Sequence, residues 1–212
     1  MDAPQAAEQI KVIRELMERP VRCTTHSGAS AVWAGLVSLA GVAADAAISA
    51  RFAPYEATAI NMFVWLAVFA AAFAGAVALT RRRARKEGRT FWTTARNRAL
   101  RAIVPPFLAG GGLTAAIVYR WVAGVGPNQW GLIPGIWMTF YGVALWQIGE
   151  FSIRATRILA GAFILSGIVA AAVFQYTIPG LTEGTAPYWT LGITFGGYHL
   201  AYGAIVWIRH GG

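Results

Sequence analysis

Charged residues and cysteine are scarce in this chain. Charged residues make up 13% of its 212 residues, about half of the usual ~25% in soluble proteins. Hydrophobic residues make up 57%, and a soluble fold cannot cover that much apolar surface, whereas a bilayer can. The single cysteine, Cys23, excludes an intrachain disulfide and leaves a free thiol or a reversible acylation site as alternatives.

Motifs for known chemistry are also missing. The sequence has no CxxC pair, no metal-ligand spacing and no glycine-rich phosphate loop. Asp45 and Glu150 are the only carboxylates in or at the ends of apolar segments, and they belong to opposite membrane faces, so no hydrolytic pair is expected. His199 has no second deep histidine, which argues against a haem held by two of them. We therefore expect neither an enzyme nor a cofactor or metal site.

Long hydrophobic runs dominate what is present. Each is close to the ~20 residues that span a bilayer as a helix. The predicted spans are Ala29–Ala50, Thr58–Thr80, Ala102–Gly124, Trp130–Gly149, Ile158–Tyr176 and Tyr188–Ile208. Pro105 and Pro106 are expected in the first turn or so of the third helix, where a missing N–H costs little. The sequence predicts an all-α bundle of six transmembrane helices.

Basic residues predict the orientation of this bundle. Nearly all of the lysines and arginines fall before the first span, between the second and third, between the fourth and fifth, and after the sixth. Six spans place these four segments on one side, which the positive-inside rule makes cytoplasmic. We therefore expect both termini in the cytoplasm, a lead-in over residues 1–28, a transmembrane domain over 29–212 and a basic cytoplasmic loop over 81–101. The N-terminus carries charges of both signs and does not resemble a signal peptide.

The lead-in contains a short amphipathic pattern. Residues Pro4–Arg19 have apolar side chains on one face and oppositely charged pairs four residues apart, which predicts a surface helix. It either lies at the membrane interface or docks on a partner or on the protein's own loop.

A resemblance extends over the first forty residues. The segment Ile13-Arg14-Glu15-Leu16-Met17-Glu18-Arg19, followed by Thr24-Thr25-His26-Ser27-Gly28 and a small-residue helix, resembles the start of a family of uncharacterised bacterial six-helix membrane proteins. The resemblance implies a multi-pass protein of the bacterial inner membrane. It implies no activity, ligand or site residue.

The spans also contain a weak internal repeat. Residues 111–121 of the third span align with 166–176 of the fifth. The fourth and sixth spans share a spacing of glycines and aromatics, in which Gly131, Gly135, Trp137, Tyr141, Gly142 and Trp146 correspond to Gly192, Gly196, Tyr198, Tyr202, Gly203 and Trp207. Spans three–four and five–six therefore read either as two copies of one hairpin or as a chance match of apolar sequence.

Small residues recur four apart in several spans. Such faces let helix backbones approach closely in lipid, within one bundle or between copies. The glycines expected to serve helix packing are Gly35, Gly75, Gly131, Gly135, Gly192 and Gly196.

Few polar residues lie within the spans. Asp45 and Arg120 fall at similar depths near the outer ends of their helices, so they either snorkel to the surface or form an ion pair lining an outward-facing cavity with Asn61 and Glu56. His199 lies near the middle of the sixth span, where it is either hydrogen-bonded to a neighbouring helix or part of a functional site. Asp45, Arg120, Asn61 and His199 form the candidate intramembrane polar site.

The basic segment has a second possible role. Beyond anchoring the topology, it can bind anionic lipid headgroups, whereas nucleic acid is not an expected partner. The residues concerned are Arg81, Arg82, Arg83, Arg85, Lys86 and Arg89.

Two functions remain open from these patterns. Abundant packing residues and little polar lining favour a non-enzymatic accessory or structural subunit, joined to other membrane subunits or to further copies of itself. The alternative is a small channel or carrier. It would need Asp45, Asn61, Arg120, Thr139, Gln147 and His199 to face one path.

Overall fold

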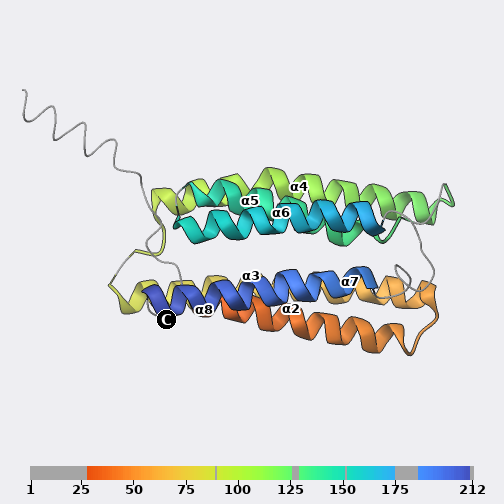
Figure 1. Ribbon diagram of the computed structural model, residues 1–212, viewed down its shortest axis with the longest axis horizontal. Coiled ribbons are helices and arrows are strands. Elements are labelled where there is room, and N and C mark those ends of the chain that lie inside the picture. Colours follow the sequence, from red (N-terminus) through yellow and green to blue (C-terminus); the bar gives the residue numbers. More distant parts are fainter. Residues whose placement is uncertain (1–27, 89, 126–128, 151, 175–185, 211–212) are drawn as a thin grey trace, which may run out of the picture.

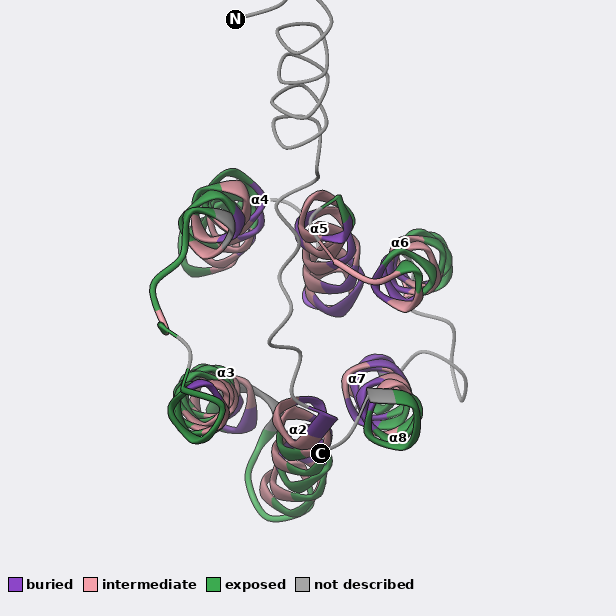
Figure 2. Cartoon of the chain, turned by 90° about the vertical axis from the view of Figure 1, so that its left-hand side faces the viewer, coloured by how far each residue is buried: buried purple, intermediate pink, exposed green. Residues whose placement is uncertain are grey.

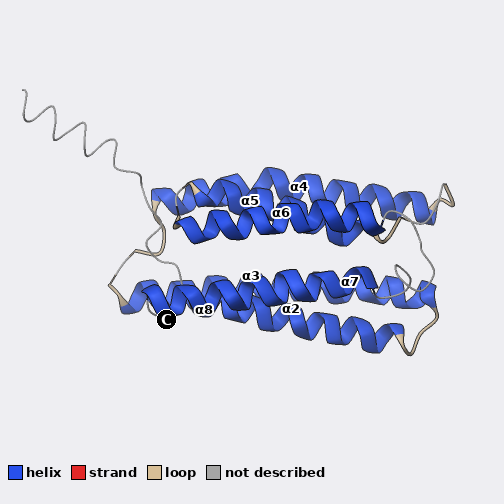
Figure 3. Ribbon diagram, viewed as in Figure 1, coloured by secondary structure: helices blue, strands red, loops and turns tan. Residues whose placement is uncertain are grey.

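The computed structural model describes residues 28–88, 90–125, 129–150, 152–174 and 186–210. Every regular element in these ranges is a helix (Figure 3). The predicted surface helix Pro4–Arg19, with Cys23, His26 and Arg89, lies outside the described residues.

Six helices in the described ranges are long and apolar enough to cross a membrane. The first five are α2 (Gly28–Ser49), α3 (Pro54–Lys86), α4 (Thr94–Val122), α5 (Leu132–Gly149) and α6 (Arg154–Phe174). The sixth crossing is built from α7 (Ala186–Leu191), the π-helix η1 (Gly192–Tyr198) and α8 (His199–His210). The predicted all-α six-helix membrane bundle is confirmed, and the π-helical segment is a feature that the hydropathy pattern did not show.

The basic segment 81–101 is mostly helical, which corrects the expectation of a loop. Helix α3 continues to Lys86, and α4 begins at Thr94, where the Thr93 hydroxyl accepts a hydrogen bond from the Arg96 backbone N–H. Arginine and lysine favour helices, so an apolar span continues through them into the polar interface. Only residues 87–93 link the two helices.

Because α4 begins earlier than predicted, its two prolines lie farther from the helix start than expected. Pro105 and Pro106 lie inside the helix rather than in its first turn. The third span was predicted from its apolar residues alone, and these begin after the first two turns of the actual helix.

The helices form two layers of three (Figures 1 and 2). One layer holds α4, α5 and α6, and the other holds α3, α2 and the α7–η1–α8 crossing. Helices α3 and α5 end and helices α4 and α6 begin at one end of the bundle, which we call the basic end, whereas α2 ends and α3 begins at the opposite, distal end. Figure 2 shows that the successive helices follow one another around the bundle, so that the sixth crossing lies next to α2.

An aromatic seam fills the space between the layers. The Phe69 ring centroid on α3 lies 5.5 Å from that of Phe107 on α4 and 6.5 Å from that of Trp137 on α5. Farther along the seam, the fully buried Phe163 ring lies 4.9 Å from Tyr141 and 4.8 Å from Phe195. Large rings therefore hold together two layers whose backbones approach closely in few places.

Candidate functional site

Asp45 is buried at the contact between α2 and α3. Its side chain is 1% exposed, and the Trp65 indole N–H donates to its Oδ1 over 3.3 Å. One turn farther along each helix, the Asn61 amide N–H donates to the Ser49 hydroxyl over 3.1 Å. The two antiparallel helices thus present two polar pairs, Asp45–Trp65 and Ser49–Asn61, at successive levels.

The sixth crossing closes this polar group from a third side. The Tyr188 ring of α7 stacks on Trp65, the residue that donates to Asp45, with ring centroids 6.3 Å apart. Asn61 is 6% exposed, and its Oδ1 has no hydrogen-bond partner among the described residues. The distal part of α2 and α3 therefore holds a buried carboxylate with one long hydrogen bond and a buried amide oxygen with none.

Arg120 does not join this group. Its side chain is exposed on α4, in the layer that does not contain α2. Among the described residues, Asp45 and Arg120 form no ion pair, and the side chain that donates to Asp45 is the neutral Trp65. Glu56, at the distal end of α3, is exposed.

His199 lies in the seam, directly after the π-helix. Its Nε2 is 2.6 Å from the Tyr141 hydroxyl of α5, and the ring is 6% exposed. The rings of Tyr141, Phe163 and Phe195 surround it at centroid distances of 5.4 to 6.0 Å. Its buried Nδ1 has no hydrogen-bond partner among the described residues. The histidine therefore joins the two layers through one hydrogen bond.

Further hydroxyl pairs join the same two layers on either side of His199. The Tyr198 hydroxyl lies 2.9 Å from that of Ser166, and the Tyr202 hydroxyl lies 2.9 Å from that of Thr156. Thr156 also lies 2.7 Å from the Ser152 hydroxyl at the basic end. Tyr198, His199 and Tyr202 of the sixth crossing thus form a line of polar contacts that runs toward the basic end.

The six predicted polar residues do not converge. Asp45 and Asn61 lie together, and His199 lies with Tyr141 farther along the bundle. Thr139 donates to the Gly135 carbonyl of its own helix. Gln147 is half-buried on α5.

Two helix contacts are built on corresponding glycines of the fourth and sixth crossings. A Cβ added at Gly135 would lie 2.7 Å from the Ala171 nitrogen of α6, and one at Gly142 would lie 2.8 Å from the Ile164 nitrogen. In the sixth crossing, a Cβ at Gly196 would lie 2.6 Å from the Leu39 side chain of α2, and one at Gly203 would lie 2.9 Å from the Val32 nitrogen. Both crossings therefore use the same glycines to pack on the next helix around the bundle, as two copies of one hairpin would.

The remaining packing glycines also meet neighbouring helices. A Cβ at Gly131 would contact the Phe174 carbonyl, one at Gly35 the Gly196 carbonyl, and one at Gly192 the Val42 side chain. Gly75 faces the Trp33 indole, which donates to the Ala71 carbonyl. The faces that carry these glycines are occupied by contacts within one chain.

The contact between α3 and α4 lacks such glycines. Their backbones hardly approach each other, and the Phe69–Phe107 ring contact bridges them. None of the 18 residues in the most apolar stretch of α3 is buried. Exposed apolar side chains follow one face of the helix together with Phe69, and we call this set the α3 stripe: Met62, Leu66, Phe69, Phe73 and Val77.

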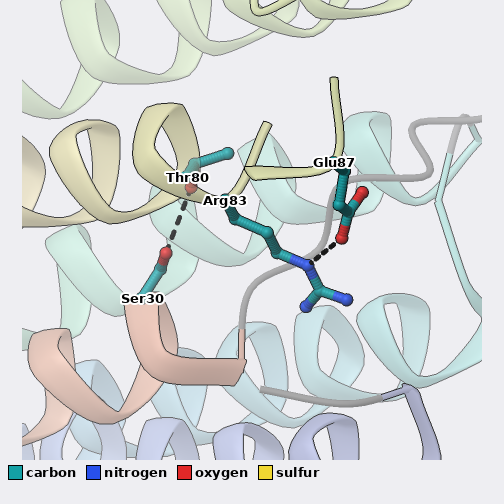
Figure 4. Close-up of polar contacts among 4 residues, drawn as sticks. All are labelled: Ser30, Thr80, Arg83 and Glu87. Carbon is teal, nitrogen blue, oxygen red and sulfur yellow. Dashed lines mark hydrogen bonds and ion pairs between the residues drawn. The ribbon is translucent and has the colours of Figure 1, made fainter. Parts of the chain in front are cut away.

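The basic segment projects from the basic end of α3. Figure 4 shows Ser30 at the start of α2 joined to Thr80 of α3 over 3.1 Å, and Arg83 paired with Glu87 over 2.7 Å. Arg81, Arg82, Arg85 and Lys86 are exposed. The positive side chains therefore extend beyond the level at which α2 begins.

Several residues of these groups were not identified from the sequence. Trp65 and Ser49 were not predicted as site residues, because tryptophan and serine are common in transmembrane spans. The internal repeat aligns Tyr141 with Tyr202, and the hydroxyls of both residues contact polar groups across the seam. This alignment was the one sequence pattern that could have indicated a role for the tyrosine hydroxyls. No family model, curated protein or solved structure matches this chain.

Proposed function

We propose that this chain is a non-enzymatic accessory subunit of a membrane assembly, and that the α3 stripe receives an apolar transmembrane helix of another subunit. The supporting observation is the difference between three helix contacts around the bundle. The α5–α6 and α2–α8 contacts are tight and glycine-based, whereas α3 and α4 leave large aromatic side chains exposed. A partner helix packed on the α3 stripe would cover these exposed side chains and give α3 a close helix contact like those of α5–α6 and α2–α8.

Site-specific photocrosslinking tests this proposal in native membranes. A photoreactive residue at Leu66, which is 64% exposed on the α3 stripe, is compared with one at Leu165, which is 67% exposed on α6 across the bundle. We expect a discrete protein adduct at Leu66 alone. Equal labelling of lipid at both positions, without a protein adduct, would contradict the proposal.

A small channel or carrier is the second candidate function. The line of polar contacts at Tyr198, His199 and Tyr202 favours it, because intramembrane polar groups often mark solute or proton paths. Ion flux in liposomes containing the purified protein distinguishes the two functions. A flux above that of empty liposomes that His199→Leu abolishes would favour the carrier.

We also infer that the basic segment binds anionic lipid headgroups of the inner membrane. Each exposed basic residue near such a surface contributes about 1 kcal/mol, and α3 presents four, as described above. Replacing Arg81, Arg82, Arg85 and Lys86 with glutamine should reduce the anionic lipid retained by the purified protein. Unchanged lipid retention would leave the segment as a topology anchor.

A further inference from the structure

We propose that Asp45, Ser49 and Asn61 form a binding site for sodium or a similarly small monovalent metal ion at the distal end of α2 and α3. The proposal is independent of the accessory role. It rests on the polar side chains that the last turn of α2 presents to the facing part of α3. Ser49 joins the other two residues, because it accepts from Asn61 and lies one turn from Asp45.

The hydrogen bonding of this group is incomplete without a ligand. Asn61 is more than nine-tenths buried, and its Oδ1 is an acceptor with no donor among the described residues. Asp45 is 1% exposed, and the 3.3 Å bond from Trp65 is long for an N–H···O hydrogen bond. A carboxylate that accepts a single long hydrogen bond and an amide oxygen that accepts none are oxygen ligands of the kind that a hard cation binds.

The charge balance favours one positive charge. A buried carboxylate is costly unless it is compensated, and the described residues around Asp45 supply no cation. Trp65, which donates to Asp45, and Tyr188, which stacks on Trp65, are neutral. Arg51 is exposed beyond the helix end, and Arg120 is exposed on the other layer. A monovalent ion would neutralise Asp45 without leaving excess charge.

The end of α2 adds to the attraction. Helix α2 ends at Ser49, so the group lies at the negative end of the helix dipole, and no basic residue in the last turn offsets this charge. Discontinuous or terminal helix ends supply backbone oxygens to cations in other membrane proteins. A divalent metal fits less well, because no cluster of three histidine, cysteine or acidic residues occurs in the described part of the chain.

Thermal unfolding of the purified full-length protein in detergent tests the proposal. Sodium chloride is titrated against choline chloride at constant ionic strength and pH. We expect a saturable rise of Tm with sodium only. Asp45→Asn should abolish it, and Asn61→Ala should weaken the apparent affinity about tenfold or more, as expected for loss of ~1.4 kcal/mol of binding energy. Glu56→Gln, which removes an exposed carboxylate from the same end of α3, should leave it unchanged.

Three results would overturn the proposal. An equal Tm in sodium and choline for the unmodified protein shows that no sodium binds, and this comparison needs no variant to fold. A sodium response that survives Asp45→Asn places the ion elsewhere. A rise of Tm on acidification that requires Asp45, without any sodium response, shows that the group holds a proton instead. If Asp45→Asn does not fold, the binding of radioactive sodium to Ser49→Ala is compared with its binding to Glu56→Gln. Equal binding by these two variants contradicts the site.

Discussion

The Tyr141 hydroxyl and the His199 Nε2 lie 2.6 Å apart and join the two layers of the bundle through the aromatic seam. Tyr141 belongs to α5, and His199 begins α8 immediately after the π-helix. A π-helical turn rotates the residues that follow it relative to an uninterrupted α-helix. The local backbone of the sixth crossing therefore contributes to placing the imidazole opposite the tyrosine.

Removing this contact should weaken the association of the layers. Tyr141→Phe keeps the ring but leaves Nε2 without its partner, and interhelical hydrogen bonds of this kind are worth about 0.6–2 kcal/mol in membranes. We expect a loss of that size in the free energy of unfolding, measured by denaturant titration in detergent. Tyr119→Phe provides the matched control, because Tyr119 is 72% exposed on α4, and it should have no effect. Equal stability of both variants would show that the Tyr141–His199 bond contributes nothing.

Alanine at Gly135 should disrupt the α5–α6 contact. Its Cβ would meet backbone atoms of Gly167 and Ala171 at 2.7 to 3.0 Å, which cannot move aside as a flexible side chain can. Overpacking of this kind costs about 1–3 kcal/mol. Gly112→Ala on α4 is the control, since nothing lies within 4 Å of its added Cβ, and it should melt at or above the Tm of the unmodified protein. Gly135→Ala with an unchanged Tm would refute the close contact.

Asp45 and Arg120 should behave as independent sites. Asp45→Ala removes a buried group and its bond to Trp65, whereas Arg120→Ala removes an exposed side chain. The effects of two substitutions on the free energy of unfolding are additive within about 0.5 kcal/mol when the sites are separate and share no partner. We expect the double variant to lose the sum of the two single losses in unfolding free energy. A double variant that is more stable than this sum by over ~1 kcal/mol would indicate an ion pair.

The orientation can be tested with reporter fusions. Fusions after Gly88 and after Gly212 should report the cytoplasm, and one after Pro127 should report the opposite side, because the arginine-rich links favour the cytoplasmic face. Accessibility of the fused reporters in intact cells and in inverted vesicles provides the measurement. A cytoplasmic signal after Pro127 would contradict the six-span orientation.

The sequence by itself determined the number of crossings and most of their boundaries. An apolar run of about 20 residues is a local property, so Ala29–Ala50 and Trp130–Gly149 agree closely with α2 and α5. The largest boundary differences occur beside the basic segment, where the helices continue through arginines that hydropathy excludes from a span. Glycine spacing indicated which faces could pack, although it could not identify their partners.

Only the tertiary structure decided which polar residues meet. The position of a residue along its span specifies its depth, and Asp45 and Arg120 share a similar depth. Depth contains no information about which way a residue faces around the helix or about which helices are neighbours. The packing places Asp45 against Trp65, on which Tyr188 stacks, and leaves Arg120 exposed on the other layer. Helix neighbours are chosen by the combined packing of many weak contacts, and that is why they become visible only once the whole bundle is assembled.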